Sequence, residues 1–598
     1  MRIVLVDNHD SFTANLAALL EAAGAQVRVF ANDDPALLRL TEVDGIVLSP
    51  GPGSPAVAGD VGHAPALLAR LPDVPVLGVC LGHQLLALLH GGEVAAVTPA
   101  HGHISAIRHS DTGLLAGLPQ GFAATRYHSL AVTAPASARF TATAWAEDGV
   151  VMALEVDGLP RWGVQFHPES VESPLGARII AAFLQAIRPT VLRRRIRGPF
   201  DPAVLFSALY GAERRAFWLD GPTTYLGTGI GCDPADHRYP EARDPLPGGA
   251  VGYRAYEGED HWLRVERVLS LTGATGDLEL RALPGPGATA WLDATAEAVE
   301  SLRGRVADVA VTAVPPATPR ATRSREQYLA DIAICKGHLA RGESYEICLT
   351  NRLRLDPVDD PLALHLQLRA RTPTGRSAYL RMDEVAICSA TPETFLTITA
   401  DGAVTARPIK GTAARHDDPV IDAETAARLA TDPKTRAENL MIVDLLRNDL
   451  NRVCETGSVA VPGYLEVETY ATLHQLVSTI TGRLRPGLTA LDAVAAAMPP
   501  GSMTGAPKER TVAILAAIEP EPRGVYSGIL GVLGADGSAD LSVVIRTAVC
   551  TPDGVMIGVG GAIVWASDPI AEYDETMLKA RALLEAYAAI GGGVTAEL

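Results

Sequence analysis

The residue best placed for covalent chemistry lies in the first third of the chain. Cys80 stands between two glycines in Gly78-Val79-Cys80-Leu81-Gly82, after an apolar, strand-like run and before a helical pattern. A tight turn there would expose the thiol at the carboxyl end of a sheet. The N-terminus of the following helix would favour the thiolate, the reactive form of cysteine. The pattern predicts a nucleophile, although a buried core thiol is also compatible with it.

A nucleophilic cysteine needs a base, and the base needs an acid that orients it. His167 and Glu169 follow a strand-like run two residues apart and could supply both, although a turn histidine also fits this position. The developing oxyanion needs backbone N–H donors. The loop Ser49-Pro50-Gly51-Pro52-Gly53 and the N–H of Leu81 could present them. These features together predict nucleophilic catalysis more strongly than any one of them alone.

Acidic residues on two expected helices form a second candidate site. Glu438 stands on a helix expected over 436–453, and Glu572 and Glu575 share one face of a helix expected over 571–590. Carboxylates from separate helices suit Mg²⁺, which keeps several waters and binds anionic ligands. Surface ion pairing is the usual fate of helical glutamates, and the spacing alone favours it.

Cationic, hydroxyl and glycine residues in the same half of the chain could bind an anion. They are Lys410, Gly411, Thr412, Tyr526, Arg546, Gly560, Gly561 and Lys579. Gly560 and Gly561 belong to a Gly-rich turn expected after a strand. Two cations, backbone amides and Mg²⁺ would suit a small dicarboxylate, although each feature alone is common in proteins.

The elements that must position these residues fall into two regions. In the first, buried strands are expected at 3–6, 27–30, 45–48 and 76–79, and helices at 12–23, 81–89 and 174–187. This alternation predicts an open, mostly parallel α/β sheet. In the second, strands are expected at 377–380, 385–389 and 404–409, beside the two long helices. That mixture predicts a large α+β domain, so the fold class is multidomain.

Breaks in composition place the domain boundaries. We expect a first domain at 1–190, a linker at 191–200, an N-terminal subdomain of the second region at 201–315 and its catalytic domain at 322–592. The run Arg193-Arg194-Arg195-Ile196-Arg197 is interpreted as a solvated linker in preference to a polyanion-binding tail. A Pro-rich segment at 314–319 separates the last two parts.

Composition narrows the classes of function. A chain of 598 residues is too long for a single core. Its net charge of -18 argues against a nucleic-acid binder. Seven widely spaced cysteines without a CxxC pair indicate free thiols in a reducing compartment. We see no signal peptide and no apolar stretch of about 18 residues, so a cytoplasmic protein without membrane contact is expected.

Residues 1 to about 187 resemble the class I glutamine amidotransferases. The resemblance lies in Gly78–Gln84 and Val164–Glu169, while Val6–Thr13 and Arg126–Leu130 are similar to the subgroup that is paired with chorismate enzymes. It implies glutamine as a substrate and Cys80, His167 and Glu169 as the catalytic triad. The residues that it assigns to the glutamine pocket are Gly51, Gly53, Leu81, Gln84, Ser129 and Leu130. His103 stands where members often carry lysine, a departure that we expect to affect domain contact alone.

Residues 323 to 588 resemble the chorismate-utilising enzymes, which include anthranilate, aminodeoxychorismate, isochorismate and salicylate synthases. Arg436–Leu440, Ala571–Thr576 and Arg407–Thr412 carry the resemblance. It implies chorismate as a substrate and Mg²⁺ as a cofactor, with Glu438 and Glu575, and Glu572 beside them, as metal ligands. The candidate anion-binding residues other than Lys410 would hold chorismate. Glu393 matches the acid that protonates the departing 4-hydroxyl.

Lys410 distinguishes members of this family. Anthranilate synthases carry alanine there, whereas aminodeoxychorismate synthases carry a lysine whose amine attacks carbon 2 of chorismate before ammonia adds at carbon 4. Such a lysine must be deprotonated, so we expect burial to lower its pKa; an anion-binding lysine is the alternative. Glu346 stands where isochorismate-forming relatives place a water-activating lysine, which disfavours water as the nucleophile.

The lysine and the order of the domains resemble fused aminodeoxychorismate synthases. They predict that ammonia from glutamine, passed within the chain, converts chorismate to 4-amino-4-deoxychorismate, a precursor of 4-aminobenzoate. A separate lyase would then be needed, because we find no third domain after residue 590. A synthase of anthranilate or aminodeoxyisochorismate is one alternative, and an inactive regulatory scaffold is another. Gln475 stands where many relatives have a histidine, so the sequence does not identify the group that handles protons late in the reaction. It also does not determine the metabolic pathway, tryptophan binding or the oligomeric state.

Overall fold

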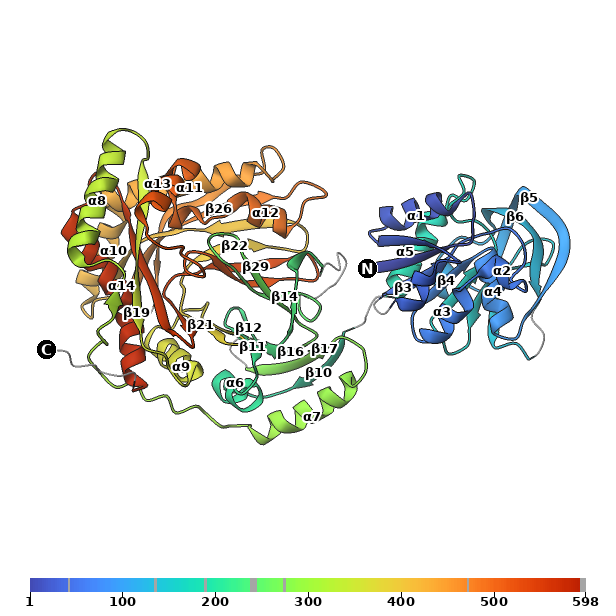
Figure 1. The fold of residues 1–598 in the computed structure, drawn as a ribbon, viewed down its shortest axis with the longest axis horizontal. Coiled ribbons are helices and arrows are strands. Elements are labelled where there is room, and N and C mark those ends of the chain that lie inside the picture. Colours follow the sequence, from blue (N-terminus) through green and yellow to red (C-terminus); the bar gives the residue numbers. More distant parts are fainter. Residues whose placement is uncertain are drawn as a thin grey trace. The chain divides into compact units, whose positions relative to one another are not determined.

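The protein is described from a computed structural model that covers residues 1–40, 43–133, 137–187, 191–236, 245–272, 276–470 and 473–591. The chain forms two compact units, residues 1–189 and 190–598 (Figure 1). The first unit is α/β and the second combines two large sheets with helices, so the predicted fold class is confirmed.

A nine-stranded sheet organises the first unit, in the order β2-β1-β3-β4-β9-β8-β7-β5-β6. Its strands are β1 (Arg2–Asp7), β2 (Gln26–Ala31), β3 (Gly45–Leu48), β4 (Val76–Val79), β5 (Glu93–His109), β6 (Phe122–Thr133), β7 (Phe140–Trp145), β8 (Val151–Val156) and β9 (Arg161–Val164). Neighbours from β2 to β9 pair in parallel, and those from β9 to β6 pair antiparallel. The predicted parallel sheet therefore makes up one half only.

Helices cover both faces of the parallel half. They are α1 (Thr13–Ala22), α2 (Ala58–Val61), α3 (Ala64–Arg70), α4 (Leu81–Leu89) and α5 (Gly176–Ala186). Alternate residues of β1 point to opposite faces, so Ile3 packs in a core with α1 and α5, while Val4 packs in another with α3 and α4. Edge strand β2 is not buried as predicted, and Val29 is half exposed, because only one side of β2 has a partner.

The second unit contains a twelve-stranded sheet in the order β10-β17-β16-β12-β11-β20-β21-β30-β31-β19-β18, with β27 against β19. Its strands are β10 (Leu192–Ile196), β11 (Arg215–Leu219), β12 (Thr223–Thr228), β16 (Arg267–Thr272), β17 (Asp277–Ala282), β18 (Arg320–Ala321), β19 (Glu346–Leu355), β20 (Ala378–Met382), β21 (Val385–Ser389), β27 (Gly505–Ala506), β30 (Thr547–Thr551) and β31 (Gly554–Ile563). Strands from both ends of the unit thus share one sheet.

A ten-stranded sheet has the order β13-β15-β14-β28-β29-β22-β23-β26-β24, with β25 against β26. Its strands are β13 (Ile230–Cys232), β14 (Ala250–Arg254), β15 (Asp260–Arg264), β22 (Thr394–Ile398), β23 (Ala403–Arg407), β24 (Ile409–Ala414), β25 (Ala460–Thr469), β26 (Leu473–Arg483), β28 (Ile529–Leu533) and β29 (Ala539–Val543). Pro408 interrupts the single strand expected at 404–409, because proline cannot donate a ladder hydrogen bond.

Nine helices of four residues or more are described in this unit, and five of them begin with an aspartate cap followed by proline. They are α6 (Pro202–Tyr210), α7 (Ala288–Ser301), α8 (Arg325–Ala340), α9 (Pro361–Arg371), α10 (Pro419–Thr431), α11 (Pro433–Asn451), α12 (Ala490–Ala497), α13 (Lys508–Ile518) and α14 (Pro569–Ala589). Asp432 caps α11 and Asp568 caps α14, each followed by a proline in the first turn. These caps fix where α11 and α14 begin, and therefore where the glutamates near the start of each helix lie.

Two segments differ from expectation. The stretch expected as a linker holds β10, whose edge pairing with β17 is reinforced by Glu279, because its carboxylate contacts Arg193 and Arg195 at 3.2 and 2.8 Å. The expected Gly-rich turn is the middle of β31, where Gly558–Ala562 pair with β19. Glycine is needed there for close packing, since a Cβ on Gly558 would collide with the Tyr526 ring.

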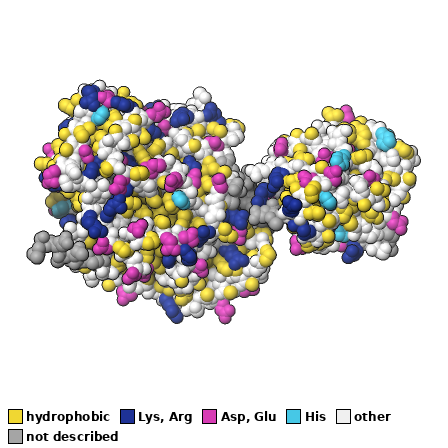
Figure 2. All heavy atoms as spheres, in the orientation of Figure 1, with side chains coloured by type: hydrophobic (Ala, Val, Ile, Leu, Met, Phe, Trp, Pro, Cys, Tyr) yellow, Lys and Arg dark blue, Asp and Glu magenta, His cyan; other side chains and the backbone are white. Residues whose placement is uncertain are grey.

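The surface carries both signs of charge. Figure 2 shows Lys and Arg interspersed with Asp and Glu on the drawn face of the second unit. Over the residues that the structure describes, no helix is both long and apolar enough to cross a membrane.

Candidate active sites

Cys80 occupies a strained turn between β4 and α4. Its φ of 51° is unusual for a residue with a side chain. A Cβ on Gly78 would collide with the backbone of Gly82, and one on Gly82 would collide with the backbone of Leu48. Only glycine allows this close approach, so the sequence around Cys80 specifies the elbow that carries the thiol.

His167 and Glu169 lie together beside that elbow. The His167 Nδ1 and the Glu169 Oε1 are 2.6 Å apart, and both side chains are almost fully buried. Burial lowers the pKa of His167, but its interactions with Cys80 and with Glu169 outweigh burial and raise the pKa to about 10. The rings of Phe12 and Tyr127 pack edge-on against the imidazole, with centroids 5.8 and 5.1 Å away. The imidazole is therefore held in one orientation, away from water.

Hydrogen bonds link two of the residues predicted for the glutamine pocket, Gln84 and Leu130, to each other and, through Gln165, to Cys80. The Gln84 amide donates to the Leu130 carbonyl at 2.9 Å and to Gln165 at 3.2 Å. Gln165 in turn donates to the Cys80 sulfur at 3.5 Å. Ser129 contacts His101 at 3.0 Å. Gln165 lies within the motif that supplied His167, yet the sequence analysis gave it no role.

The predicted oxyanion loop approaches the same elbow. A Cβ on Gly51 would collide with Asn8 and with Leu81, so this loop packs directly on the start of α4. Asn8 fixes the loop by two hydrogen bonds of 2.8 Å with Ser49. Gly53 has a φ of 88°, which favours glycine.

A cavity of about 620 Å³ in the second unit brings the other candidate residues together. Its lining includes the whole predicted chorismate and metal set: Glu393, Lys410, Gly411, Thr412, Glu438, Tyr526, Arg546, Gly560, Gly561, Glu572, Glu575 and Lys579. Strand β24 belongs to the ten-stranded sheet and β31 to the twelve-stranded sheet, while α11 and α14 supply the carboxylates. The cavity is therefore built where both sheets and two capped helices meet.

Lys410 is buried at this cavity with carboxylates beside it. Its Nζ donates to Glu346 at 2.6 Å and lies 4.0 Å from Glu438. Burial lowers the pKa of Lys410, but the two carboxylates outweigh burial and raise the pKa above its ordinary value. The expectation of a lowered pKa was therefore wrong for the protein without substrate, because it considered burial and left out the partner charges.

Glu393 has the opposite character. Its side chain is buried, and burial raises its pKa to about 7, against smaller lowering effects of Ser502 and Lys410. A carboxyl group with this pKa holds its proton for part of the time at neutral pH and can donate it.

Two of the three predicted metal ligands pair with one ammonium group, that of Lys434. The Lys434 Nζ donates to Glu572 and lies 3.6 Å from Glu438. Glu575 pairs with Lys579 at 2.9 Å. Among the described residues, no three acidic, histidine or cysteine side chains are gathered as a metal site. The site is thus not preformed, but its chemistry fits Mg²⁺, since oxygen ligands from two helices already share a cation.

Other predicted residues are braced by their neighbours. The Lys579 Nζ donates to the Gly560 carbonyl at 3.1 Å. Arg546 has a φ of 50°, and burial lowers its pKa. Gln475 lines the cavity, whereas His474, the next residue on β26, points away and contacts Asp422 at 2.9 Å.

Two family models cover nearly the whole chain. Residues 4–187 match the class-I glutamine amidotransferases, and residues 234–585 match the chorismate binding enzymes. The crystal structure of anthranilate synthase component I from Streptococcus pneumoniae is similar to 65% of this chain and 99% of its own, with a TM-score of 0.52 and 26% identity.

Relatives of matching length identify the branch. The aminodeoxychorismate synthase of Streptomyces griseus is 38% identical, covering 98% of this chain and 95% of its own. That of Streptomyces pristinaespiralis is 39% identical, covering 100% and 98%. The chain belongs to the aminodeoxychorismate synthase family. Membership in this family explains why an amidotransferase unit and a chorismate-binding unit occur in one chain.

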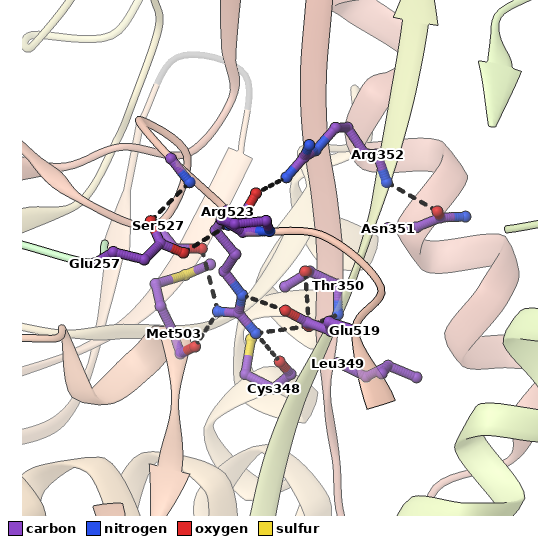
Figure 3. A network of polar contacts seen from close by, with 12 residues as sticks. Glu257, Cys348, Leu349, Thr350, Asn351, Arg352, Met503, Glu519, Arg523 and Ser527 are labelled. Carbon is purple, nitrogen blue, oxygen red and sulfur yellow. Dashed lines mark hydrogen bonds and ion pairs between the residues drawn. The ribbon is translucent and has the colours of Figure 1, made fainter. Parts of the chain in front are cut away.

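In this member of the aminodeoxychorismate synthase family, a buried ion pair supports the chorismate cavity. Arg523 donates to Glu519 at 2.8 Å and to the Cys348 carbonyl at 2.8 Å, and it also contacts the Met503 carbonyl (Figure 3). Cys348 and Met503 line the cavity. No motif signalled this network, whereas Lys434 could have been found from its place one helical turn before Glu438.

Proposed function

We propose that the chain hydrolyses glutamine in its first unit and uses the ammonia in its second unit to convert chorismate to 4-amino-4-deoxychorismate. The observation that carries this proposal is the position of Lys410, which lines one cavity with the acid Glu393 and the three metal carboxylates. The full-length aminodeoxychorismate synthase relatives support the same reaction.

In the amidotransferase unit, Cys80 would attack the side-chain amide of glutamine. His167 takes the thiol proton and returns it to the leaving ammonia, and water then hydrolyses the Cys80 thioester to release glutamate. Glu169 holds the imidazole in place through the 2.6 Å bond. Backbone N–H groups of Gly51 and Leu81 are the proposed donors to the oxyanion.

In the chorismate unit, Arg546 and Lys579 are the proposed partners of the substrate carboxylates. Glu393 donates its proton to the 4-hydroxyl, which leaves as water. Because its carboxylate partners favour the protonated form, Lys410 first loses a proton to water; its neutral amine then forms a bond to carbon 2, and ammonia adds at carbon 4 as that bond breaks. Bound Mg²⁺ would neutralise a substrate carboxylate; Glu438, Glu572 and Glu575 are the residues that would hold it.

The product keeps its enolpyruvyl group, so a separate lyase would be needed to release pyruvate and give 4-aminobenzoate. We place the reaction in the cytoplasm. In support, no disulfide joins the seven cysteines, all of which lie in described parts of the chain, as expected in a reducing compartment.

Product identification tests the proposal. Purified protein is incubated with chorismate, glutamine and Mg²⁺, and the products are separated by chromatography and identified by mass spectrometry, with and without an added 4-amino lyase. We expect 4-aminobenzoate only after the lyase is added. Anthranilate in the absence of the lyase would instead assign the chain a 2-amino synthase activity, with Lys410 as an anion-binding residue.

A further inference from the structure

Glu346 lies behind the chorismate cavity and is not part of its lining. Its side chain is 1% exposed. One carboxylate oxygen, Oε1, accepts the bond from Lys410 at 2.6 Å, while Oε2 has no hydrogen-bond partner among the described residues. A buried carboxylate oxygen without a partner is costly. Burial of the Glu346 carboxylate therefore destabilises the protein, and its one described side-chain hydrogen bond is with the Lys410 nitrogen.

The backbone of Glu346 is fixed on all sides. It is the first residue of β19 and pairs with Ala506 of β27, while the next residue, Ile347, pairs with Ile563 of β31. The Ser344 hydroxyl donates to the Glu346 carbonyl at 2.9 Å. The carboxylate thus starts from a rigid point in the twelve-stranded sheet and reaches a lysine that belongs to the ten-stranded sheet.

A second buried lysine shows what an ion pair with a purely structural role looks like in this unit. The Lys508 Nζ donates to Asp449 at 2.7 Å and also to the Ala497 carbonyl at 2.7 Å, and neither Lys508 nor Asp449 lines the cavity. Lys410 makes one hydrogen bond within the described part of the protein, and its partner Glu346 is outside the cavity lining. Its nitrogen is therefore held from behind and remains open toward the substrate.

The alternative position for the Lys410 nitrogen is close at hand. Glu438, one of the proposed metal ligands, lies 4.0 Å away. Without Glu346, the long and flexible lysine side chain would be drawn to Glu438, away from its wild-type position. Two carboxylates thus compete for one ammonium group, and the shorter contact decides its position.

We propose that Glu346 is the positioning residue of Lys410, holding the lysine nitrogen at the back of the cavity and directed toward the ring carbon that it attacks. The inference rests on the proposed role of Lys410 as the nucleophile. Glu346 touches the Lys410 nitrogen and does not line the cavity that would hold chorismate, so its loss should slow the chemical step while leaving chorismate binding nearly intact.

The test uses the full-length protein with chorismate, Mg²⁺ and an ammonium salt, which bypasses the amidotransferase unit. For Glu346→Ala we expect a loss in kcat of about 10²-fold, the effect of displacing a reacting group by roughly 1 Å. The KM for chorismate should change little. Glu346→Gln keeps an acceptor oxygen at the same place, so it should retain more activity than Glu346→Ala, and it carries the test if the alanine variant does not fold.

Asp449→Asn is the matched control, because it disrupts a buried lysine–carboxylate pair that does not face the cavity. It should lower the thermal midpoint of the protein and leave kcat unchanged. A crystal structure of Glu346→Ala should show the Lys410 nitrogen displaced toward Glu438.

Three results would overturn the inference: an unchanged kcat in Glu346→Ala, a decrease no larger than in Asp449→Asn, or an undisplaced lysine nitrogen. In each case the wild-type product would still be 4-amino-4-deoxychorismate. If the wild type makes anthranilate, the proposed function itself fails, and the two failures are thereby distinguished.

Discussion

Lys434 and Glu438 lie one helical turn apart on α11, and the Lys434 Nζ is 3.6 Å from the Glu438 carboxylate. The same ammonium bonds Glu572 on α14, so it links the two helices that carry the proposed metal ligands. A positive charge therefore already occupies the region between these carboxylates, and an incoming Mg²⁺ must displace it.

Replacing Lys434 with methionine should strengthen Mg²⁺ binding several-fold, because the internal competitor is removed. The variant should also be less stable in EDTA, since the cation that links Glu438 to Glu572 is then missing. Calorimetric titration with Mg²⁺ and thermal melts with and without EDTA measure both effects. Lys336→Met, which removes a lysine bonded to the Ser567 carbonyl, is the control. Weaker Mg²⁺ binding by Lys434→Met would show that the lysine assists the metal.

Changing Cys80 to serine should abolish synthesis driven by glutamine and preserve synthesis driven by an ammonium salt. Serine lacks the thiolate that attacks the amide, while the chorismate cavity is untouched. Chorismate consumption with each nitrogen source gives the comparison. Cys232→Ser, in the other unit, should keep both activities. Loss of both activities in Cys80→Ser would mean that the thiol has a structural role.

Glu393 should impose a pH dependence on the chorismate reaction. Its pKa is raised to about 7, and the protonated form that donates a proton is present below this pKa. At constant free ammonia, kcat/KM for chorismate should therefore fall as the pH rises through about 7, because kcat/KM reports the protein without substrate. Glu393→Gln cannot donate a proton, and it should lose about 10²-fold or more in kcat together with this pH dependence. A variant that keeps the wild-type profile would assign the proton to another group.

Glu519 should matter for stability more than for chemistry. Glu519→Gln leaves the buried Arg523 guanidinium without its counter-charge, and breaking such a pair costs about 3–5 kcal/mol. We expect a lower thermal midpoint, measured by calorimetry. The KM for chorismate should rise only slightly, because Arg523 bonds the carbonyls of the cavity-lining residues Cys348 and Met503. An unchanged midpoint would mean that water replaces the missing charge at little cost.

The local elements and the chemical residues could be predicted from the sequence. Strands at 45–48 and 76–79 and the helix at 81–89 have the predicted bounds, since apolar runs with glycine or capping residues at their ends are local signals. The residues assigned to chorismate and metal line one cavity. Their motifs consist of residue types at fixed spacing, so they can be identified in the sequence without knowledge of the tertiary fold.

Features that depend on distant partners could not be predicted. Strand β10 depends on pairing with β17, a segment far along the chain. The environment of Lys410 depends on Glu346, which is 64 positions away and belongs to another sheet. Burial alone suggested that the pKa of Lys410 is lowered. The pKa is raised instead because Glu346 lies within hydrogen-bonding distance.

The pairing of β14 with β28 also sets the order in which the chain can fold during synthesis. Residues 250–254 must wait for residues 529–533, and β11 must wait for β20 before its sheet can extend. The first unit is complete by residue 189, so it can fold while the ribosome is still translating the rest. The second unit can close its twelve-stranded sheet only after β30 and β31 have been synthesised, which should slow its folding and leave its early strands dependent on protection from aggregation until then.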